Sequence, residues 1–140
     1  MIDQTHPTIT DVIAVAEFRS ALRHFLRRSE KVARQSGLTP QRYTLLMMIK
    51  GAPGGDEQST VTELAERLQL AQSTVTELVR RAETAGLIER EQSQRDARVA
   101  HLRLTSEGER RLMLSFTELD AERAQLREAF ASLDGGATGH

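Results

Sequence analysis

The chain has 140 residues, the length of one domain, and its 39% hydrophobic residues and 9 glycines reach the lower edge of the globular range. Zero cysteines exclude disulfides and thiolate zinc sites, and no apolar run approaches the roughly 20 residues of a membrane span. Nineteen basic and 20 acidic residues give a net charge of −1, without the basic excess typical of nucleic-acid binders. With no signal-peptide pattern at the start, we expect a soluble cytoplasmic protein with no membrane contact.

Apolar residues spaced three and four positions apart predict a long first helix over residues 11–36. The apolar stripe contains Val15, Phe18, Leu22, Phe25 and Val32. Another face of the helix is basic, with Arg19, Arg23, Arg27, Lys31 and Arg34. Gly37 then has the position of a residue that ends a helix.

Three shorter helices are predicted next. Thr39 followed by Pro40 is a typical helix start, and the helix continues through Ile49. Thr60 and Glu63 have the spacing of a capping box, which starts a short helix. Its buried side is Leu64, Ala65 and Leu68. After a tight turn, residues 72–85 form another helix that Gly86 ends. This helix buries Val75, Leu78, Val79 and Ala82.

Residues 87–91 and 99–104 predict two paired strands, because apolar and polar residues alternate in the second segment. The residues between them form a polar, charged tip. A last helix is predicted over residues 105–133, with Ser106 and Glu109 in a second capping box. Its apolar stripe contains Leu112, Phe116, Leu119, Leu126, Phe130 and Leu133. We expect Asp134-Gly135-Gly136 to end this helix and the residues beyond to be disordered.

The predicted fold class is therefore mainly α with a small β-hairpin wing, a winged helix-turn-helix with long N- and C-terminal dimerisation helices. A helix about 10–12 Å across fits the major groove of DNA, which is about 12 Å wide, and a basic hairpin tip can reach the neighbouring minor groove. We interpret residues 1–140 as a single domain with its winged head at 39–104. Residues 11–36 and 105–133 are the expected dimerisation helices.

An ordered set of motifs supports this interpretation. It consists of Val61 to Leu68 (VTELAERL), Ser73 to Arg81 (STVTELVRR), Gly86 to Arg90 (GLIER), Arg95 to Arg98 (RDAR) and Leu104 to Gly108 (LTSEG). In this order and spacing the chain resembles the MarR family of bacterial transcription regulators. The resemblance implies an obligate homodimer whose terminal helices interlock. It also implies two winged heads on a pseudo-palindromic operator, most often as a repressor that a small-molecule effector releases.

The apolar stripes also favour a homodimer, because they provide more apolar surface than one small head can cover. Packing of the two stripes on each other within a monomer remains an alternative.

The candidate DNA contacts lie on the second helix of the helix-turn-helix and in the wing. Serine, threonine and glutamine can bond to phosphates or base edges, although helix capping and solvation explain these residues too. The helix candidates are Gln72, Ser73, Thr74, Thr76, Arg80 and Arg81. Two positions depart from the family pattern, Ala71 where a capping serine is common and Glu77 where a basic or polar contact residue is common.

In the wing, the resemblance implies that Asp96 orients an arginine and that Arg98 enters the minor groove, with Arg95 beside it. The narrow minor groove of A-rich DNA attracts an inserted arginine. A solvated charged surface is the alternative explanation for this cluster.

Many relatives bind small aromatic anions between the long helices and the head. The residues here that could line such an effector pocket are His24, Arg27, Tyr43, Met47, Met113 and Phe116, although core packing explains most of them equally well. The four histidines are far apart in the sequence and no catalytic or metal-binding motif is present, so we expect no enzyme, cofactor or metal. A winged-helix protein-interaction module without DNA binding is the competing hypothesis, since it fits the neutral net charge and Glu77.

Overall fold

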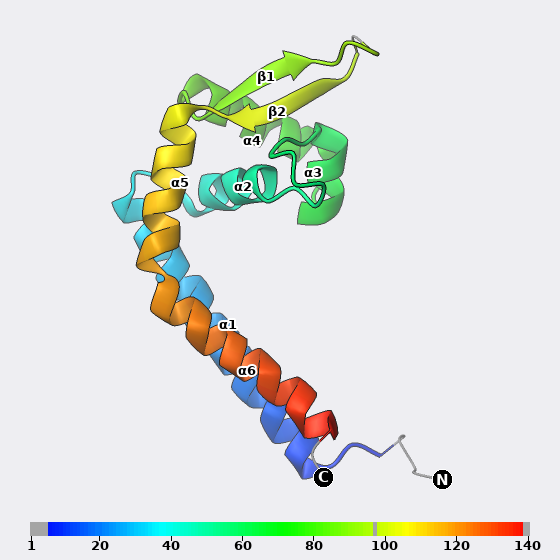
Figure 1. Ribbon diagram of the computed structural model, residues 1–140, viewed down its shortest axis with the longest axis vertical. Helices are drawn as coiled ribbons and strands as arrows, with labels where there is room; N and C mark the ends of the chain where they lie inside the picture. The colour runs from blue at the N-terminus through cyan, green and yellow to red at the C-terminus, as the bar shows by residue number, and fades with distance from the viewer. Residues whose placement is uncertain (1–5, 97, 139–140) are drawn as a thin grey trace. The chain divides into compact units, whose positions relative to one another are not determined.

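The computed structural model describes residues 6–96 and 98–138, which form helices and one antiparallel hairpin (Figure 1). The helices are α1 (Ile9–Gln35), α2 (Pro40–Lys50), α3 (Val61–Leu68), α4 (Gln72–Thr84), α5 (Ser106–Glu118) and α6 (Asp120–Thr138). The strands are β1 (Ile88–Gln92) and β2 (Ala100–Leu104), paired from Ile88 with Leu104 to Gln92 with Ala100. The predicted mainly α fold with a small β-hairpin wing is confirmed. Ala97 of the wing motif and the two residues after 138 lie outside the described residues.

The chain divides into two compact units. The helical pair consists of the segment up to Val32 and the segment from Thr117, and it contains most of α1 together with α6. The winged head, Ala33–Phe116, contains α2, α3, α4, the hairpin and most of α5.

In the helical pair, α1 and α6 run antiparallel. The Phe18 and Phe130 rings meet edge to face at 5.9 Å between centroids. Further along, the Arg28 Nε donates to the Glu122 carboxylate at 3.1 Å. An aromatic contact and an ion pair therefore hold the two helices together.

The prediction of one continuous helix over residues 105–133 is wrong. The helix is interrupted at Leu119, and α6 continues through Asp134-Gly135-Gly136 to Thr138. Apolar periodicity does not detect a one-residue interruption, because the stripe keeps its register on both sides. Each of the two glycines lowers helix stability by only about 1 kcal/mol relative to alanine, and this cost is too small to end α6.

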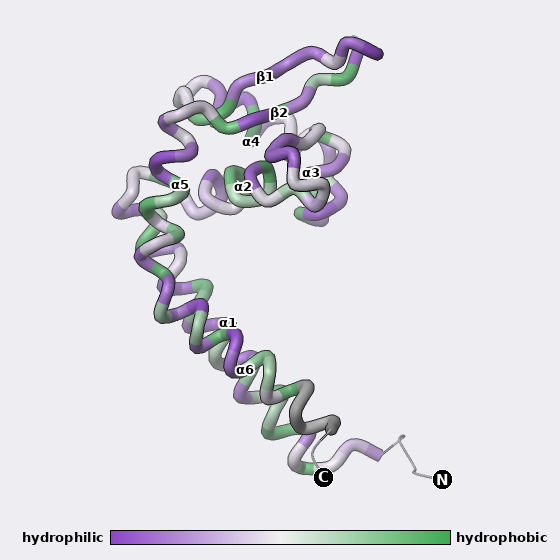
Figure 2. The backbone as a smooth tube through the Cα atoms, in the orientation of Figure 1, coloured by the Kyte–Doolittle hydropathy of each residue, from purple (hydrophilic) through white to green (hydrophobic). Residues whose placement is uncertain are grey.

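The core of the winged head is apolar and draws on every element of the head. Its most deeply buried side chains are Leu38, Leu45, Leu46, Ile49, Leu64, Val75, Val79, Leu87 and Leu102. Leu68 and Leu78, which we expected to be buried, are only partly so, and Leu68 is the last residue of the short helix α3. Figure 2 shows the head's apolar segments at α2 and at the bases of the strands.

Local capping patterns were mostly predicted correctly. The Thr60 hydroxyl accepts from the Glu63 N–H at 3.1 Å, and the Thr60 N–H donates to the Glu63 carboxylate at 2.8 Å, which confirms the capping box. The second predicted box is wrong. Thr105 caps α5 by accepting from the Gly108 N–H at 3.1 Å, and the Glu109 carboxylate is bound by Lys50 instead.

Gly108 allows α5 to lie against the chain that enters β1. A Cβ at this position would lie 2.2 Å from the Leu87 carbonyl oxygen, a backbone atom that cannot move aside cheaply. We therefore predict that Gly108→Ala lowers the free energy of unfolding by about 1–3 kcal/mol, as overpacked sites do. Urea titrations should show a lower midpoint. The matched control is Gly54→Ala, whose Cβ would meet its nearest atom at 3.6 Å, and equal midpoints for the two variants would contradict the prediction.

Candidate nucleic-acid interface

A left-handed residue forms the turn between α3 and α4. Gln69 has a φ of 56° and ends α3, and its side chain donates to the Glu66 carbonyl at 2.7 Å. The Leu70 N–H donates to the Ala65 carbonyl at 3.0 Å. These bonds satisfy backbone carbonyl groups at the end of α3, so α4 can begin at Gln72, three residues after Gln69.

The first turns of α4 present polar side chains to solvent. Val75 and Val79 are fully buried, so the opposite face is outward, and Gln72, Ser73, Thr74 and Thr76 are all exposed. The Gln72 amide donates to the Thr62 hydroxyl at 3.3 Å. Sequence reasoning missed Thr62, because only the packing of α3 beside α4 makes these two residues neighbours. In the described chain no side chain caps α4, since Ala71 stands at its N-cap.

Further along α4, one carboxylate binds both candidate arginines. The Arg80 Nε lies 3.2 Å and the Arg81 Nε 3.1 Å from oxygens of the Glu77 carboxylate. The hydrogen bond from Arg80, helped by Arg81, holds the pKa of Glu77 below its usual value, and Glu77 raises the pKa of Arg80. The three side chains form a cluster of ion pairs on the solvent side, which we call the Glu77 cluster.

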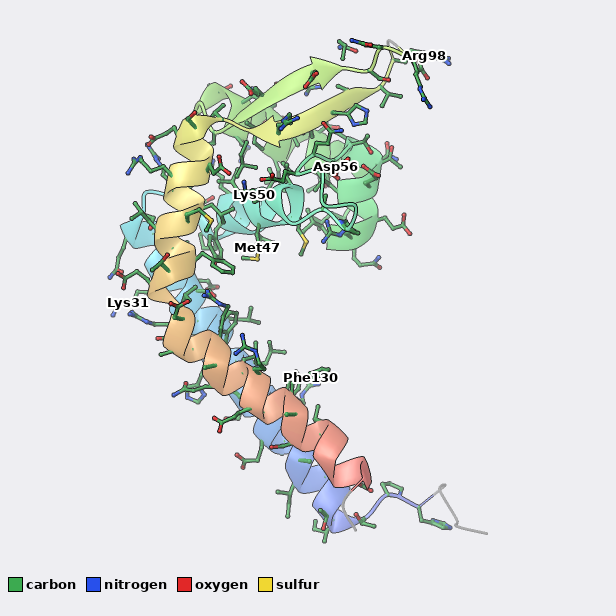
Figure 3. All side chains as sticks on the ribbon, in the orientation of Figure 1. Lys31, Met47, Lys50, Asp56, Arg98 and Phe130 are labelled. Carbon is green, nitrogen blue, oxygen red and sulfur yellow. The ribbon has the colours of Figure 1, made fainter. Side chains whose placement is uncertain are left out.

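Short-range side-chain bonds join the described residues of the wing tip. The Asp96 carboxylate accepts from the Arg98 N–H at 3.0 Å and from its Nε at 3.2 Å. The Arg98 side chain is 90% exposed and lies at the end of the hairpin (Figure 3). The Ser93 hydroxyl accepts from the N–H groups of Arg95 and Asp96 at 3.2 and 3.3 Å. Sequence reasoning missed Ser93, although a serine that begins a polar turn is a usable signal for such a bond.

Two contacts fix the wing to the helices of the head. Ser59 exchanges backbone hydrogen bonds with Leu102 of β2, at 3.1 and 2.7 Å, which ties the segment before α3 to the wing. The Arg90 Nε on β1 donates to Glu83 of α4 at 2.9 Å. The exposed face of α4 and the wing therefore belong to one connected body.

The residues predicted to line an effector pocket do not share one unit. His24 and Arg27 belong to the helical pair, and the other four belong to the winged head. The His24 Nδ1 lies within hydrogen-bond distance of the Ser20 carbonyl oxygen, at 2.8 Å. Tyr43 is buried and Met47 is partly buried. Met113 and Phe116 are exposed. The pocket stays a prediction.

The described residues form neither a metal cluster nor a membrane-spanning helix. No group of three or more histidine or acidic side chains is placed to hold a metal ion within 6–96 and 98–138. No helix in this part of the chain is both long and apolar enough to cross a membrane.

Residues 36–99 match the model of the MarR family. The matched segment contains α2, α3, α4 and the wing up to the residue before β2. Over this segment the chain is similar to MarR-family proteins. No curated protein matches the chain. Among solved structures, it is similar to the transcriptional regulator Tm0710 from Thermotoga maritima. The two are 27% identical over 87% of this chain and 78% of that one, with a TM-score of 0.59.

Two other solved structures extend the comparison. A MarR family transcription regulator is 25% identical over 91% of this chain and 82% of that one, with a TM-score of 0.69. A mutant of S. aureus MepR bound to an oligodeoxyribonucleotide is 22% identical over 79% of each chain, with a TM-score of 0.65. The chain therefore has the fold of MarR family transcription regulators.

Proposed function

We propose that this protein is a dimeric, sequence-specific DNA-binding transcription regulator. The observation that carries the proposal is the pairing, in one compact unit, of an exposed polar face on α4 with a 90% exposed arginine at the wing tip. In a winged helix-turn-helix these two features reach the major groove and the adjacent minor groove. The oligodeoxyribonucleotide bound to the MepR mutant supports the proposal, because that protein shares the fold.

The proposed roles follow from the chemistry of each side chain. Gln72 can pair with adenine through two hydrogen bonds, while Ser73, Thr74 and Thr76 can bond to bases or phosphates. The uncapped N–H groups at the start of α4 favour a nearby phosphate. Arg80, Arg81 and Arg95 are proposed phosphate contacts, and Arg98, oriented by Asp96, is the proposed minor-groove contact.

The homodimer is part of the same proposal, and the helical pair supports it. Even with α1 and α6 packed together, this unit leaves large apolar side chains exposed. They are Ile9, Val12, Ile13, Val15, Leu26 and Phe130. A second copy of the chain would cover such a patch. Figure 2 shows apolar residues recurring along both helices, and Figure 3 labels Phe130 on α6.

Leu119 must be removed from the expected interface. Its side chain is 0% exposed within a single chain, so it already has a place in the fold. Repression, and its relief by a small aromatic or anionic effector, are finer proposals that rest on the family resemblance.

The first test is fluorescence anisotropy with DNA flanking the protein's own gene, at several salt concentrations. The wild type should bind, and Arg98→Ala should abolish most of the affinity and flatten the log–log salt slope by about 0.9 for each phosphate-type interaction that it removes. Arg110→Ala is the matched control, because it removes one exposed arginine from α5. A wild type that binds no DNA would favour the protein-interaction module. Equal affinities of the two variants would remove the wing from the mechanism.

Base readout by α4 predicts a position-dependent loss. Gln72→Ala or Thr74→Ala should relax base preference at defined operator positions by about 1–3 kcal/mol. Competition titrations against single-base operator variants measure this preference. A uniform loss across all operator variants would instead assign these side chains to phosphate contacts.

The dimer is tested at two exposed positions of the helical pair. Val15 and Leu26 are 49% and 52% exposed and take no part in the Phe18–Phe130 contact, so we expect the double substitution Val15→Glu, Leu26→Glu to leave the packing of α1 against α6 intact. In a dimer it buries unpaired charge, which costs several kcal/mol. Sedimentation should show monomers and a matching loss of DNA affinity. Ala16→Glu is the control, because it adds charge at an exposed position of α1 about 100° around the helix from Val15. A monomeric wild type, or a double variant that still dimerises, would contradict the dimer.

A further inference from the structure

We propose that Glu77 is a specificity-determining residue that keeps Arg80 and Arg81 from phosphate and thereby suppresses binding to arbitrary DNA. This inference rests on the proposed DNA-binding function and adds a role that opposes affinity. Glu77 lies one helical turn before the two arginines, so its carboxylate reaches both guanidinium groups from within α4.

The charge of α4 shows why the cluster matters. The helix carries two arginines, Arg80 and Arg81, against two glutamates, Glu77 and Glu83, so its formal charge is zero. Glu83 is bound by Arg90 of the wing, which leaves Glu77 as the carboxylate opposite the two arginines. Arg80 and Arg81 are more than half exposed, so they can exchange partners with a phosphate that approaches α4.

An exchange of this kind affects arbitrary DNA most. Contacts between arginine and phosphate are independent of sequence and supply essentially all of non-specific binding. Each guanidinium bonded to Glu77 is withheld from these sequence-independent phosphate contacts. The exposed hydroxyl and amide groups in the first turns of α4 remain free to contact DNA. On an operator, the base contacts of the first turns hold α4 against the backbone, so Arg80 and Arg81 can exchange Glu77 for phosphate there, whereas on random DNA no base contact supports that exchange. The cluster therefore lowers the affinity for random DNA more than the affinity for an operator, and it raises the ratio between these two affinities.

The chain contains a matched control for Glu77. Glu107 on α5 has arginines at the same two spacings, and its carboxylate accepts from Arg110 at 2.6 and 2.9 Å and from Arg111 at 2.7 Å. Glu77→Gln and Glu107→Gln thus remove the same charge from the same spacing of two arginines. Only the first changes α4.

The experiment compares wild type, Glu77→Gln and Glu107→Gln on two duplexes of equal length, one from the region flanking the protein's own gene and one of random sequence. Glu77→Gln should bind the random duplex about threefold more tightly, the scale of an exposed ion pair. Its log–log salt slope should steepen by up to about 0.9 for each arginine released, and its preference for the gene-flanking duplex should fall. Glu107→Gln should match the wild type. In an Arg80→Ala, Arg81→Ala background, Glu77→Gln should have no effect, since its partners are gone.

The possible failures can be told apart. A wild type that binds neither duplex would overturn the DNA-binding function and this inference with it. A wild type that binds, with Glu77→Gln indistinguishable from Glu107→Gln, would overturn this inference alone. Weaker binding by Glu77→Gln, confined to operators with a cytosine at one position, would show that Glu77 accepts from a base, and would also overturn it. Circular dichroism verifies that each variant retains its helices.

Discussion

The candidate interface depends on the backbone pairing between Ser59 and Leu102. The two residues exchange N–H to carbonyl bonds at 3.1 and 2.7 Å, and Leu102 is fully buried. The segment that leads into α3 is therefore a short third partner of the hairpin, so the wing cannot turn without disturbing the start of the helix-turn-helix. A two-stranded hairpin alone is marginally stable in water, and this attachment supplies the missing support.

The distribution of charge matters more than the net charge of −1. Within α4 and α5 the arginines are bound by glutamates three or four residues earlier. At the wing tip, by contrast, Arg98 is paired with Asp96 while its side chain is 90% exposed. A pair as exposed as this is weak in water and exchanges readily for a phosphate. A neutral protein can thus present cationic charge locally, which is why composition alone neither identified nor excluded a nucleic-acid partner.

Features with local causes were predictable from the sequence, and those with distant causes were not. The Thr60–Glu63 capping box and the helix end at Gly37, with its φ of +78°, follow from residues within one turn. The contact of Gln72 with Thr62 and the Ser59–Leu102 pairing join segments whose proximity only packing determines. For the candidate site, the sequence therefore predicted which residues α4 and the wing carry, but not the contacts that hold them.

The stripe on the last helical segment shows the same limit in energetic terms. Leu119 and Phe130 belong to one apolar periodicity, yet Leu119 is 0% and Phe130 62% exposed. Periodicity records which side chains gain from leaving water, not which surface covers them. At about 25 cal/mol per Å² of apolar surface, Leu119 already contributes to the stability of one chain, whereas Phe130 can contribute the rest of its surface only on association. A substitution at Leu119 is thus expected to lower the stability of one chain, whereas a substitution at Phe130, which also contacts Phe18, is expected to affect both folding and assembly, although the sequence places both residues in the same pattern.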